Sequence, residues 1–371
     1  MILFLHNSYR TSGGEERVVE DLRWLVSEQL GEDARLLGRD SDATGRSRAA
    51  AGLLLGGLGA SQVTAAVREH GARVVHAHNL QPTLGWRALA GARKAGARVV
   101  VHLHQYRLVC AIGVCFREGS ECTRCHGRNT LPGLVHNCRS NRAQALTYAA
   151  GLALWQKRML ELADAVIVPS QFAQLRLREL GVPLPERGVH VLAPPLREFV
   201  QSSRARSGGY ALVVSRLAPE KGVDVAIEAC RMAGLELVIA GEGPEMGSLR
   251  AQAGTGEVRF LGRVGRERLS ELRAGASIAL VPSRSAETFG LAAAEAMAAG
   301  LPVAASRVGA LPELVDPVGL VPVGDPAALA CAIERLRDDE QAGERALARV
   351  RERCSPARLA SELAVVYDGQ R

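Results

Sequence analysis

Short aliphatic runs alternate with longer amphipathic stretches along the whole chain. A short apolar run between turn residues is typical of a buried strand, and apolar positions three and four apart are typical of a helix. The pattern predicts helices at Glu15–Gln29 and Ala145–Ala163, and a helix capped by Ser170 that ends at Gly181. In the first half it predicts six strands, at Ile2–Leu5, Ala34–Leu37, Val74–Ala77, Arg98–Leu103, Ala165–Val168 and Val189–Leu192.

The same rhythm restarts after a Pro- and Ser-rich stretch that contains SSRARSGG. We expect an N-terminal domain over residues 1–195, a linker over 196–209, a second domain over 210–354 and a final helical segment over 355–371. The second half predicts strands at Tyr210–Ser215, Leu235–Ala240, Val258–Leu261, Ile278–Val281, Pro302–Ala305 and Gly319–Val321. Alternating strands and helices predict an α/β fold with two doubly wound, Rossmann-like domains. Ligands are then expected at the carboxyl ends of the strands, in a cleft between the domains.

Composition excludes some functions and leaves others open. Aromatic residues make up only 4% of the 371 residues, which argues against a surface that stacks nucleic-acid bases. The net charge of +7 comes from scattered arginines without a basic tail, so we expect no nucleic-acid partner. The N-terminus has no charged leader, and the apolar stretch Ala49–Ala60 is too short to span a bilayer. We therefore expect a cytoplasmic protein, and a peripheral membrane contact stays open.

Two cations follow the first strand of the second half. Arg216 and Lys221 in VSRLAPEKG lie between a strand and a helix, where free backbone N–H groups and the helix dipole favour an anion. They could bind a diphosphate, or they could simply be solvated. Gly241 and Gly243, after the next strand, permit a tight turn with close ligand approach, or form an ordinary strand-to-helix turn.

Two glutamates flank the start of a later helix. Glu287 precedes the helix and Glu295 lies within it, where it could also be an ordinary exposed carboxylate. Gly290 permits an unusual backbone at the helix entry. The backbone N–H groups near Phe289, Gly290 and Leu291 could hold sugar hydroxyls or phosphate.

These motifs resemble a known family when they are read together. In order along the chain stand VSRLAPEKG, AGEGP, FLGRV, VPSRSAETFGLAAAEAMAAGLPVAAS and GALPELV. The five blocks span nearly all of Tyr210–Val323 and resemble glycosyltransferase family 4, whose members have the two-domain GT-B fold. The resemblance implies that Arg216 and Lys221 bind the donor diphosphate and act in catalysis. It also implies that the sugar keeps its anomeric configuration, that no metal is needed at the diphosphate, and that the final helix crosses back to the first domain.

The resemblance assigns further roles in the second half. Glu287 would contact the transferred sugar, and Glu295 would bind the ribose hydroxyls of the nucleoside. Arg263 and Val264 would meet the base through their backbone. A front-face reaction with an oxocarbenium-like transition state follows from the resemblance, because no protein nucleophile is evident.

The first half carries a Gly-Gly turn and two His-x-His pairs. Gly13 and Gly14 in HNSYRTSGGEER resemble the family's glycine-rich loop, which faces donor phosphate and acceptor. Alternate residues of a strand share a face, so each histidine pair projects one way. By resemblance, His104 lies beside the transferred sugar and is a catalytic residue, and we expect His78 and Asn79 on the acceptor side. Histidines that only cap a strand end are the alternative for His76 and His102, and no third ligand completes a zinc site.

Five of the eight cysteines fall within residues 110–138. Cys122 and Cys125 have the spacing of a zinc ligand pair, and Cys110 and Cys138 could complete a structural zinc site. His126 and His136 are possible substitutes, Cys115 is a spare thiol, and disulfides or unliganded thiols stay open. A subset of the family has a similar cysteine-rich insert. The isolated Cys230, Cys331 and Cys354 are interpreted as small buried hydrophobic residues.

The sequence thus predicts a retaining glycosyltransferase of the EC 2.4 type. The expected donor is a UDP- or GDP-sugar, and the acceptor is a glycan, a lipid-linked sugar or a small molecule. No cofactor is expected for catalysis. The alternatives are a nucleotide-sugar epimerase or another GT-B enzyme such as a phosphorylase, a zinc-containing nucleic-acid-binding protein, and an inactive sugar-nucleotide sensor.

Overall fold

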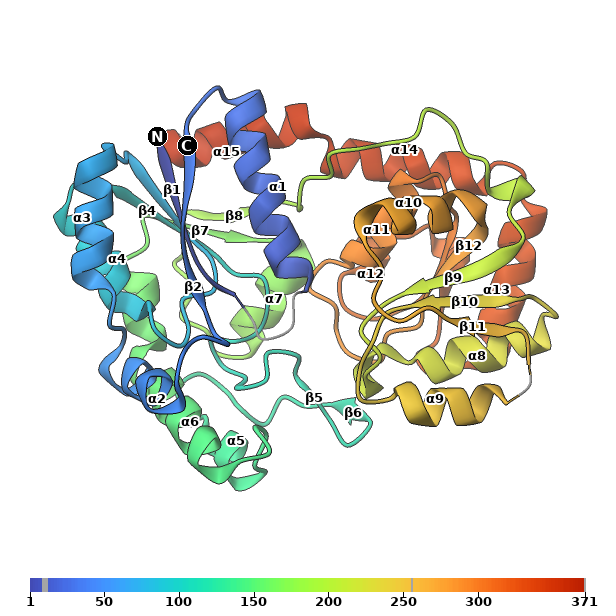
Figure 1. The fold of residues 1–371 in the computed structure, drawn as a ribbon, viewed down its shortest axis with the longest axis horizontal. Helices are drawn as coiled ribbons and strands as arrows, with labels where there is room; N and C mark the ends of the chain where they lie inside the picture. Colours follow the sequence, from blue (N-terminus) through green and yellow to red (C-terminus); the bar gives the residue numbers. More distant parts are fainter. Residues whose placement is uncertain (9–12, 255, 370–371) are drawn as a thin grey trace. The chain divides into compact units, whose positions relative to one another are not determined.

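The computed structural model describes residues 1–8, 13–254 and 256–369 (Figure 1). The chain divides into two compact units. The first consists of Met1–Cys115, Cys122–Pro195 and Pro356–Arg371, and the second of Phe116–Glu121 and Leu196–Ser355. Part of the predicted glycine-rich loop, residues 9–12, and the last two residues of the predicted final segment lie outside the described residues.

The first unit is built on a six-stranded parallel sheet in the order β2-β1-β3-β4-β7-β8. Its strands are β1 (Ile2–Ser8), β2 (Ala34–Asp40), β3 (Val74–Ala77), β4 (Arg98–His102), β7 (Ala165–Val168) and β8 (Val189–Val191). All six predicted strands are present. However, β1 and β2 each extend three residues further, because the polar ends His6 and Asn7 are buried and still pair with β2.

Helices cover this first sheet. They are α1 (Gly14–Gln29), α2 (Arg46–Leu55), α3 (Ala60–His70), α4 (Gly85–Lys94), α5 (Leu131–Val135), α6 (Arg142–Glu161), α7 (Gln171–Glu179) and α15 (Pro356–Asp368). Because side chains alternate along a strand, Leu3, Val75 and Val101 pack with α3, α4 and α6 into one core. The opposite face carries His76 and His102, and there α15 lies against α1 and β4. As predicted, Ser170 caps α7, by accepting a hydrogen bond from the N–H of Ala173.

The last helix packs on the first unit although it follows the second along the chain. Arg98 donates from Nε to the carbonyl of Val366 at 3.0 Å, and Arg73 pairs with Asp368 at 2.9 Å. The Tyr367 side chain is 1% exposed. The final segment therefore contributes to the core of the first unit.

The second unit has a six-stranded parallel sheet in the order β11-β10-β9-β12-β13-β14. Its strands are β9 (Tyr210–Val214), β10 (Leu237–Ala240), β11 (Val258–Phe260), β12 (Ala276–Val281), β13 (Val303–Ser306) and β14 (Leu320–Val321), and all match predicted strands. From β9 the chain adds β10 and β11 on one side of the sheet, and it then continues with β12, β13 and β14 on the other side of β9. In such sheets ligands bind outside the carboxyl ends of the strands at this reversal.

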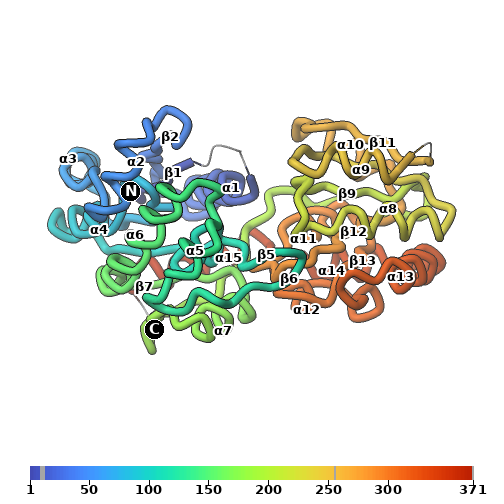
Figure 2. The backbone as a smooth tube through the Cα atoms, turned by 90° about the horizontal axis from the view of Figure 1, so that it is seen from below, coloured from blue at the N-terminus to red at the C-terminus, as the bar shows by residue number. Residues whose placement is uncertain are grey.

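Helices and a small hairpin complete the second unit. The α-helices are α8 (Val223–Met232), α9 (Met246–Ala253), α10 (Arg266–Gly275), α11 (Leu291–Ala298), α12 (Leu311–Leu314), α13 (Pro326–Asp338) and α14 (Ala342–Cys354) (Figure 2). Three short 3-10 turns are η1 (Ala205–Ser207), η2 (Pro219–Lys221) and η3 (Pro317–Gly319), and the hairpin joins β5 (Phe116–Arg117) to β6 (Ser120–Glu121).

The segment expected to be a linker is packed against the second unit. The Ser203 hydroxyl donates to the carbonyl of Gly300 at 2.6 Å, and the N–H of Leu196 donates to the carbonyl of Cys354 at 3.3 Å. A Cβ on Gly208 would lie 2.1 Å from the carbonyl oxygen of Ala276. Residues 196–209 are therefore fixed by backbone contacts of this unit.

Among the described residues, no single helix has the length and apolar character needed to cross a bilayer. The helices α2 and α3 meet both criteria only when they are taken together, and this pair is bent by 81°.

Gly309 packs closely against the backbone of Glu287, so a larger residue at this position should destabilise the second unit. Gly309 and Gly324 both have left-handed backbones, with φ of +63° and +76°. A Cβ on Gly309 would lie 2.3 Å from the Glu287 nitrogen, whereas a Cβ on Gly324 would meet nothing within 4 Å. Both alanine variants bear the backbone strain of about 1 kcal/mol, but only Gly309→Ala must also displace the neighbouring chain.

We expect Gly309→Ala to lower the free energy of unfolding by roughly 2 kcal/mol more than Gly324→Ala, in urea titrations followed by circular dichroism. Equal losses in the two variants would contradict the proposed close packing.

Candidate functional site

The turns that follow β9 and β12 are joined through their backbones. The N–H groups of Arg284 and Ser285 both donate to the carbonyl of Glu220, at 2.9 and 3.2 Å. Gly222 has φ of +62°, and a Cβ there would lie 2.1 Å from the carbonyl oxygen of Pro282. The two turns therefore hold each other at the reversal of the strand order.

This junction brings Lys221 and Glu287 into contact. Lys221 Nζ donates to Glu287 Oε1 at 2.6 Å, and the Ser283 hydroxyl donates to the same oxygen at 2.7 Å. The side chains of Lys221 and Glu287 are 27% and 18% exposed. Burial by itself would raise the pKa of Glu287, but the Lys221 charge and the two hydrogen bonds lower it below its ordinary value. The site thus holds a fixed carboxylate and a partly exposed ammonium.

More cations surround the start of α8. Arg216 pairs with the buried Glu220, yet its side chain remains 49% exposed. Arg284 forms a two-pronged ion pair with Asp224 and donates to the carbonyl of Pro219 at 3.3 Å. Since α8 begins here without a side-chain cap, cations and helix N–H groups both favour an anionic ligand.

The start of α11 has the geometry expected from its glycine. Gly290 has φ of +96°, and α11 has no side-chain cap there. A Cβ at this position would lie 2.7 Å from Leu311 Cδ2. Phe289 is buried and Leu291 is half-buried, so any ligand contact from Phe289 would come from its backbone.

Glu295 differs from the exposed carboxylate considered as an alternative. Its side chain is 10% exposed and forms an ion pair with Arg273, which is 13% exposed. Sequence reasoning missed Arg273, because no spacing rule links a residue of α10 to one of α11. The ribose role of Glu295 stays a prediction, and one of its oxygens is already held by a guanidinium.

The glycines after β10 have a packing role in this structure. Cβ atoms on Gly241 and Gly243 would lie 1.8 and 2.1 Å from the carbonyl oxygens of Ser215 and Leu217. The N–H of Arg263 donates to Glu242 Oε1 at 3.3 Å, and Val264 next to it is half-buried. Close approach of the turns after β9 and β10 therefore explains both glycines without a ligand.

In the first unit, four histidines form two hydrogen-bonded pairs. His78 Nδ1 lies 2.7 Å from His104 Nε2, with ring centroids 5.0 Å apart and planes 15° apart. His76 Nε2 lies 3.3 Å from His102 Nδ1, with centroids 5.4 Å apart and planes 6° apart. The pairs stack, since the His76 and His78 rings are 4.4 Å apart and the His102 and His104 rings 4.1 Å apart. We call these four residues the imidazole array.

Three members of the array satisfy a distance test for a metal site but not its geometry. One nitrogen each of His76, His78 and His102 lie within 4.8 Å of one another. A metal must lie in the plane of each imidazole that binds it, on the nitrogen lone pair. Because His76 and His78 are stacked with planes only 28° apart, their lone pairs do not converge. We therefore assign no metal to the array.

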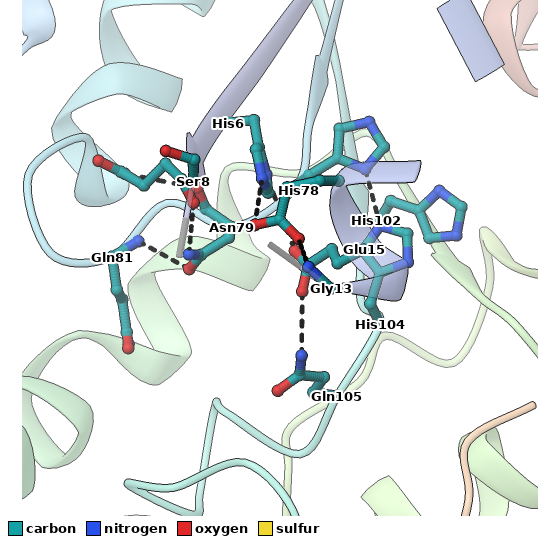
Figure 3. Close-up of polar contacts among 12 residues, drawn as sticks. His6, Ser8, Gly13, Glu15, His78, Asn79, Gln81, His102, His104 and Gln105 are labelled. Atoms are coloured by element: carbon teal, nitrogen blue, oxygen red, sulfur yellow. Dashed lines mark hydrogen bonds and ion pairs between the residues drawn. The ribbon is translucent and has the colours of Figure 1, made fainter. Parts of the chain in front are cut away.

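The array lies beside the end of β1 and the start of α1 (Figure 3). His6 lies 3.8 Å from Glu15 and 3.6 Å from Glu16, and Gln105 donates to Glu15 at 3.2 Å. Gly13, directly before Gly14 and α1, donates its N–H to Glu16 Oε2 at 2.8 Å. Two carboxylates thus already compensate the positive end of this helix.

His78 and Asn79 are both buried, at 5% and 9% exposed, and their position on the acceptor side stays a prediction. Asn79 donates from its side chain to the carbonyl of Asn7 at 2.8 Å and accepts from the N–H of Gln81. The strand-end position was correct, but both side chains are engaged within the protein. Tyr367, whose hydroxyl lies 2.8 Å from His76 Nδ1, gave no signal in the sequence because it is 291 residues away.

None of the eight cysteines, all of which the structure describes, forms a disulfide. Among the described residues, the only three candidate ligands within 4.8 Å of one another are histidines, so Cys110, Cys122, Cys125 and Cys138 do not converge that closely. A hydrogen bond from the Cys115 thiol lowers the pKa of Cys110 to about 6, against burial and with help from backbone N–H groups. Cys115 therefore interacts with Cys110, and its place outside the predicted zinc ligand set stays a prediction. Cys331 is exposed, so its predicted burial is wrong.

The array predicts acid sensitivity of the first unit. Burial, helped by His104, lowers the pKa of His76 to about 3, and burial also lowers the pKa values of His78, His102 and His104. The unfolded chain therefore takes up protons first, so stability is complete above about pH 6.5 and falls as the pH drops. Each neutral histidine contributes about 1.4 kcal/mol per pH unit.

We expect urea titrations between about pH 7 and about pH 5 to show this loss, and His76→Asn to reduce the slope by about one proton. A stability independent of pH over that range would contradict the buried neutral array.

Two family descriptions match the two halves of the chain. Residues 12–195 match "Glycosyl transferase 4-like domain", and residues 208–339 match "Glycosyl transferases group 1". A GDP-mannose-dependent alpha-mannosyltransferase of Mycobacterium tuberculosis is 36% identical over 182 residues, which cover 46% of this chain and 47% of that protein. A phosphatidyl-myo-inositol mannosyltransferase of Mycolicibacterium smegmatis is 35% identical over 145 residues, 36% and 37% of the two chains. The matches thus span less than half the length of these curated relatives.

Solved structures match over the full length. Anabaena HepE, in complex with UDP and glucose, has a TM-score of 0.65 at 19% identity and covers 99% of both chains. Sucrose-phosphate synthase from Thermosynechococcus elongatus has a TM-score of 0.71 at 20% identity and covers 99% of this chain and 98% of its own. These likenesses establish the GT-B fold. Together with the family matches to both halves, they show that the chain belongs to glycosyltransferase family 4.

Proposed function

We propose that the protein is a retaining glycosyltransferase that uses a nucleotide-sugar donor and binds its diphosphate at the start of α8. The observation that carries this proposal is the Lys221–Glu287 contact of 2.6 Å at the point where the strand order of the second sheet reverses. A cation, a carboxylate and a helix start then lie at the place where doubly wound sheets bind ligands.

The leaving group determines what the cations do. Negative charge grows on the nucleoside diphosphate as the glycosidic bond breaks, and fixed cations stabilise that charge without reorganisation. Lys221 is held by Glu287, and the exposed part of Arg216 retains further N–H donors. In this proposal the two cations take the place of a metal at the diphosphate.

The remaining donor contacts follow the sequence motifs. Glu287 accepts from hydroxyls of the transferred sugar, Glu295 from ribose hydroxyls, and the backbones of Arg263 and Val264 meet the base. Backbone N–H groups near Phe289, Gly290 and Leu291 bind the sugar or a phosphate. His104, half-buried after β4, contacts the transferred sugar from the first unit.

Relatives narrow the donor without fixing it. The mannosyltransferase relative is named for GDP-mannose, and the HepE structure contains UDP and glucose. We therefore propose a UDP- or GDP-sugar donor, with a glycan, a lipid-linked sugar or a small molecule as acceptor.

The test is a panel of UDP-, GDP-, ADP- and TDP-sugars, with release of nucleoside diphosphate as the readout. Release from one donor identifies base and sugar together, and dependence on an added acceptor separates a transferase from an epimerase. Release from no donor would contradict the proposal.

Lys221→Ala and Glu287→Ala should each lower transfer at least about a hundredfold, because each removes a preorganised charge at the leaving group or the sugar. The matched control is the exposed pair Arg231–Glu228 on α8, whose side chains are 72% and 37% exposed. Arg231→Ala should change transfer less than about twofold. The measurements are initial rates of transfer, with circular dichroism to confirm that each variant is folded. Near-normal transfer by Lys221→Ala or Glu287→Ala would refute the assignment of these residues to the donor site.

We also propose a structural zinc at Cys110, Cys122, Cys125 and Cys138, supported by the CxxC spacing of Cys122 and Cys125. Zinc binding would have to draw together four thiols that the structure does not place within 4.8 Å of one another. Metal analysis of purified protein should give about one zinc per chain, lost in Cys125→Ser and retained in Cys331→Ser. Metal-free protein in which the four thiols react freely would exclude the site.

A further inference from the structure

Within the imidazole array, only one histidine is hydrogen-bonded to His104. His78 approaches it edge to edge, with 2.7 Å between Nδ1 and Nε2, while His102 lies on its ring face. The two neighbours of His104 therefore make different contacts. His78 can determine which nitrogen of His104 carries the proton, whereas His102 packs against the face of the His104 ring.

The surroundings of His78 indicate the direction of this bond. His78 Nε2 is buried and has no hydrogen-bond partner among the described residues. A buried N–H group without an acceptor costs roughly 1–3 kcal/mol, and such orphaned donors are rare. The ring proton of a neutral His78 is therefore better placed on Nδ1, where it is donated to His104.

We propose that His78 is a positioning residue for His104: it donates Nδ1–H to Nε2 of His104 and thereby fixes His104 with its own proton on Nδ1. This inference rests on the proposed function, in which His104 contacts the transferred sugar. A fixed ring proton presents one defined donor to a sugar hydroxyl, whereas a ring free to change tautomer presents a donor only part of the time.

Other titratable groups lie near the His78–His104 hydrogen bond. The titratable groups that face the array from β1, α1, β3, β4 and α15 are His6, Glu15, Glu16, His76, His102 and Tyr367. Burial lowers the pKa of His104, as do His102 and His6, and Glu16 opposes them. A hydrogen bond donated to the neutral form also disfavours its protonation.

The experiment compares three substitutions in the full chain. His78→Phe keeps a flat ring in the stack but removes both ring nitrogens, including the Nδ1 that bonds to His104. His78→Asn retains an amide near the position of Nδ1 that can donate the same bond. His102→Phe disturbs the other neighbour of His104, which stacks on it at 4.1 Å, and leaves the His78 bond in place.

We expect His78→Phe to lower kcat roughly tenfold to a hundredfold with little change in KM for the donor, and to move the acid limb of the pH–rate profile to higher pH. His78→Asn should restore most of kcat and the wild-type limb. His102→Phe should keep kcat near the wild-type value, and its limb should move to higher pH only as far as the lost effect of His102 on the pKa of His104 requires. A wild-type kcat and limb in His78→Phe, or equal losses in the Phe and Asn variants, would overturn the proposal.

Nitrogen-15 NMR of histidine-labelled protein tests the bond without any assay of transfer. The His104 signals should show a protonated Nδ1 and a bare, hydrogen-bonded Nε2, and His78→Phe should move both nitrogens toward the averaged shifts of a ring that changes tautomer. A protonated Nε2 on His104 in the wild-type protein would overturn the proposal. If the NMR result holds and no donor releases nucleotide, the proposed function fails and the hydrogen bond stands.

Discussion

The contact between Lys221 and Glu287 is the interaction on which the second unit's site depends. A half-buried carboxylate is costly unless a charge and hydrogen-bond donors compensate it, and here Lys221 and Ser283 do so. The pair remains in place because the turns after β9 and β12 share backbone hydrogen bonds and two close glycine contacts, at Gly222 and Gly309. Packing of the backbone therefore sets the spacing of the charges.

The first unit also buries titratable side chains, but it keeps them neutral instead of pairing them with an opposite charge. It buries several imidazoles at the ends of β3 and β4, and the low polarity there keeps them neutral. Neutral rings can stack and bond to one another without repulsion, which charged rings could not. The final helix closes this array with Tyr367, so the end of the chain helps hold residues near its beginning.

Much of this could be predicted from the sequence. Aliphatic runs identify every strand of both large sheets. The inner strands are buried on both faces and need continuous apolar side chains, whereas the edge strands β2, β8 and β11 are partly exposed. Their polar ends could not be identified, since His6 and Asn7 are polar and still buried. The ordered motifs of the second half located Lys221 and Glu287, but not Ser283 or Arg273, whose partners depend on how turns and helices meet.

Other failures have equally physical reasons. A strand-end histidine can face a ligand or another histidine, and only the structure shows that His78 faces His104. An isolated cysteine on a helix can point inward or outward, and Cys331 points outward. For Gly241 and Gly243 the sequence leaves a ligand contact and an ordinary strand-to-helix turn both open, and neighbouring carbonyl groups suffice to require both glycines.

The most direct measurement is a crystal structure of the protein with a bound nucleoside diphosphate. We expect the phosphate oxygens to lie within hydrogen-bond distance of Lys221 Nζ and the Arg216 guanidinium, at the N-terminal end of α8. Phosphates bound elsewhere, with Lys221 and Arg216 contacting only protein, would contradict this expectation.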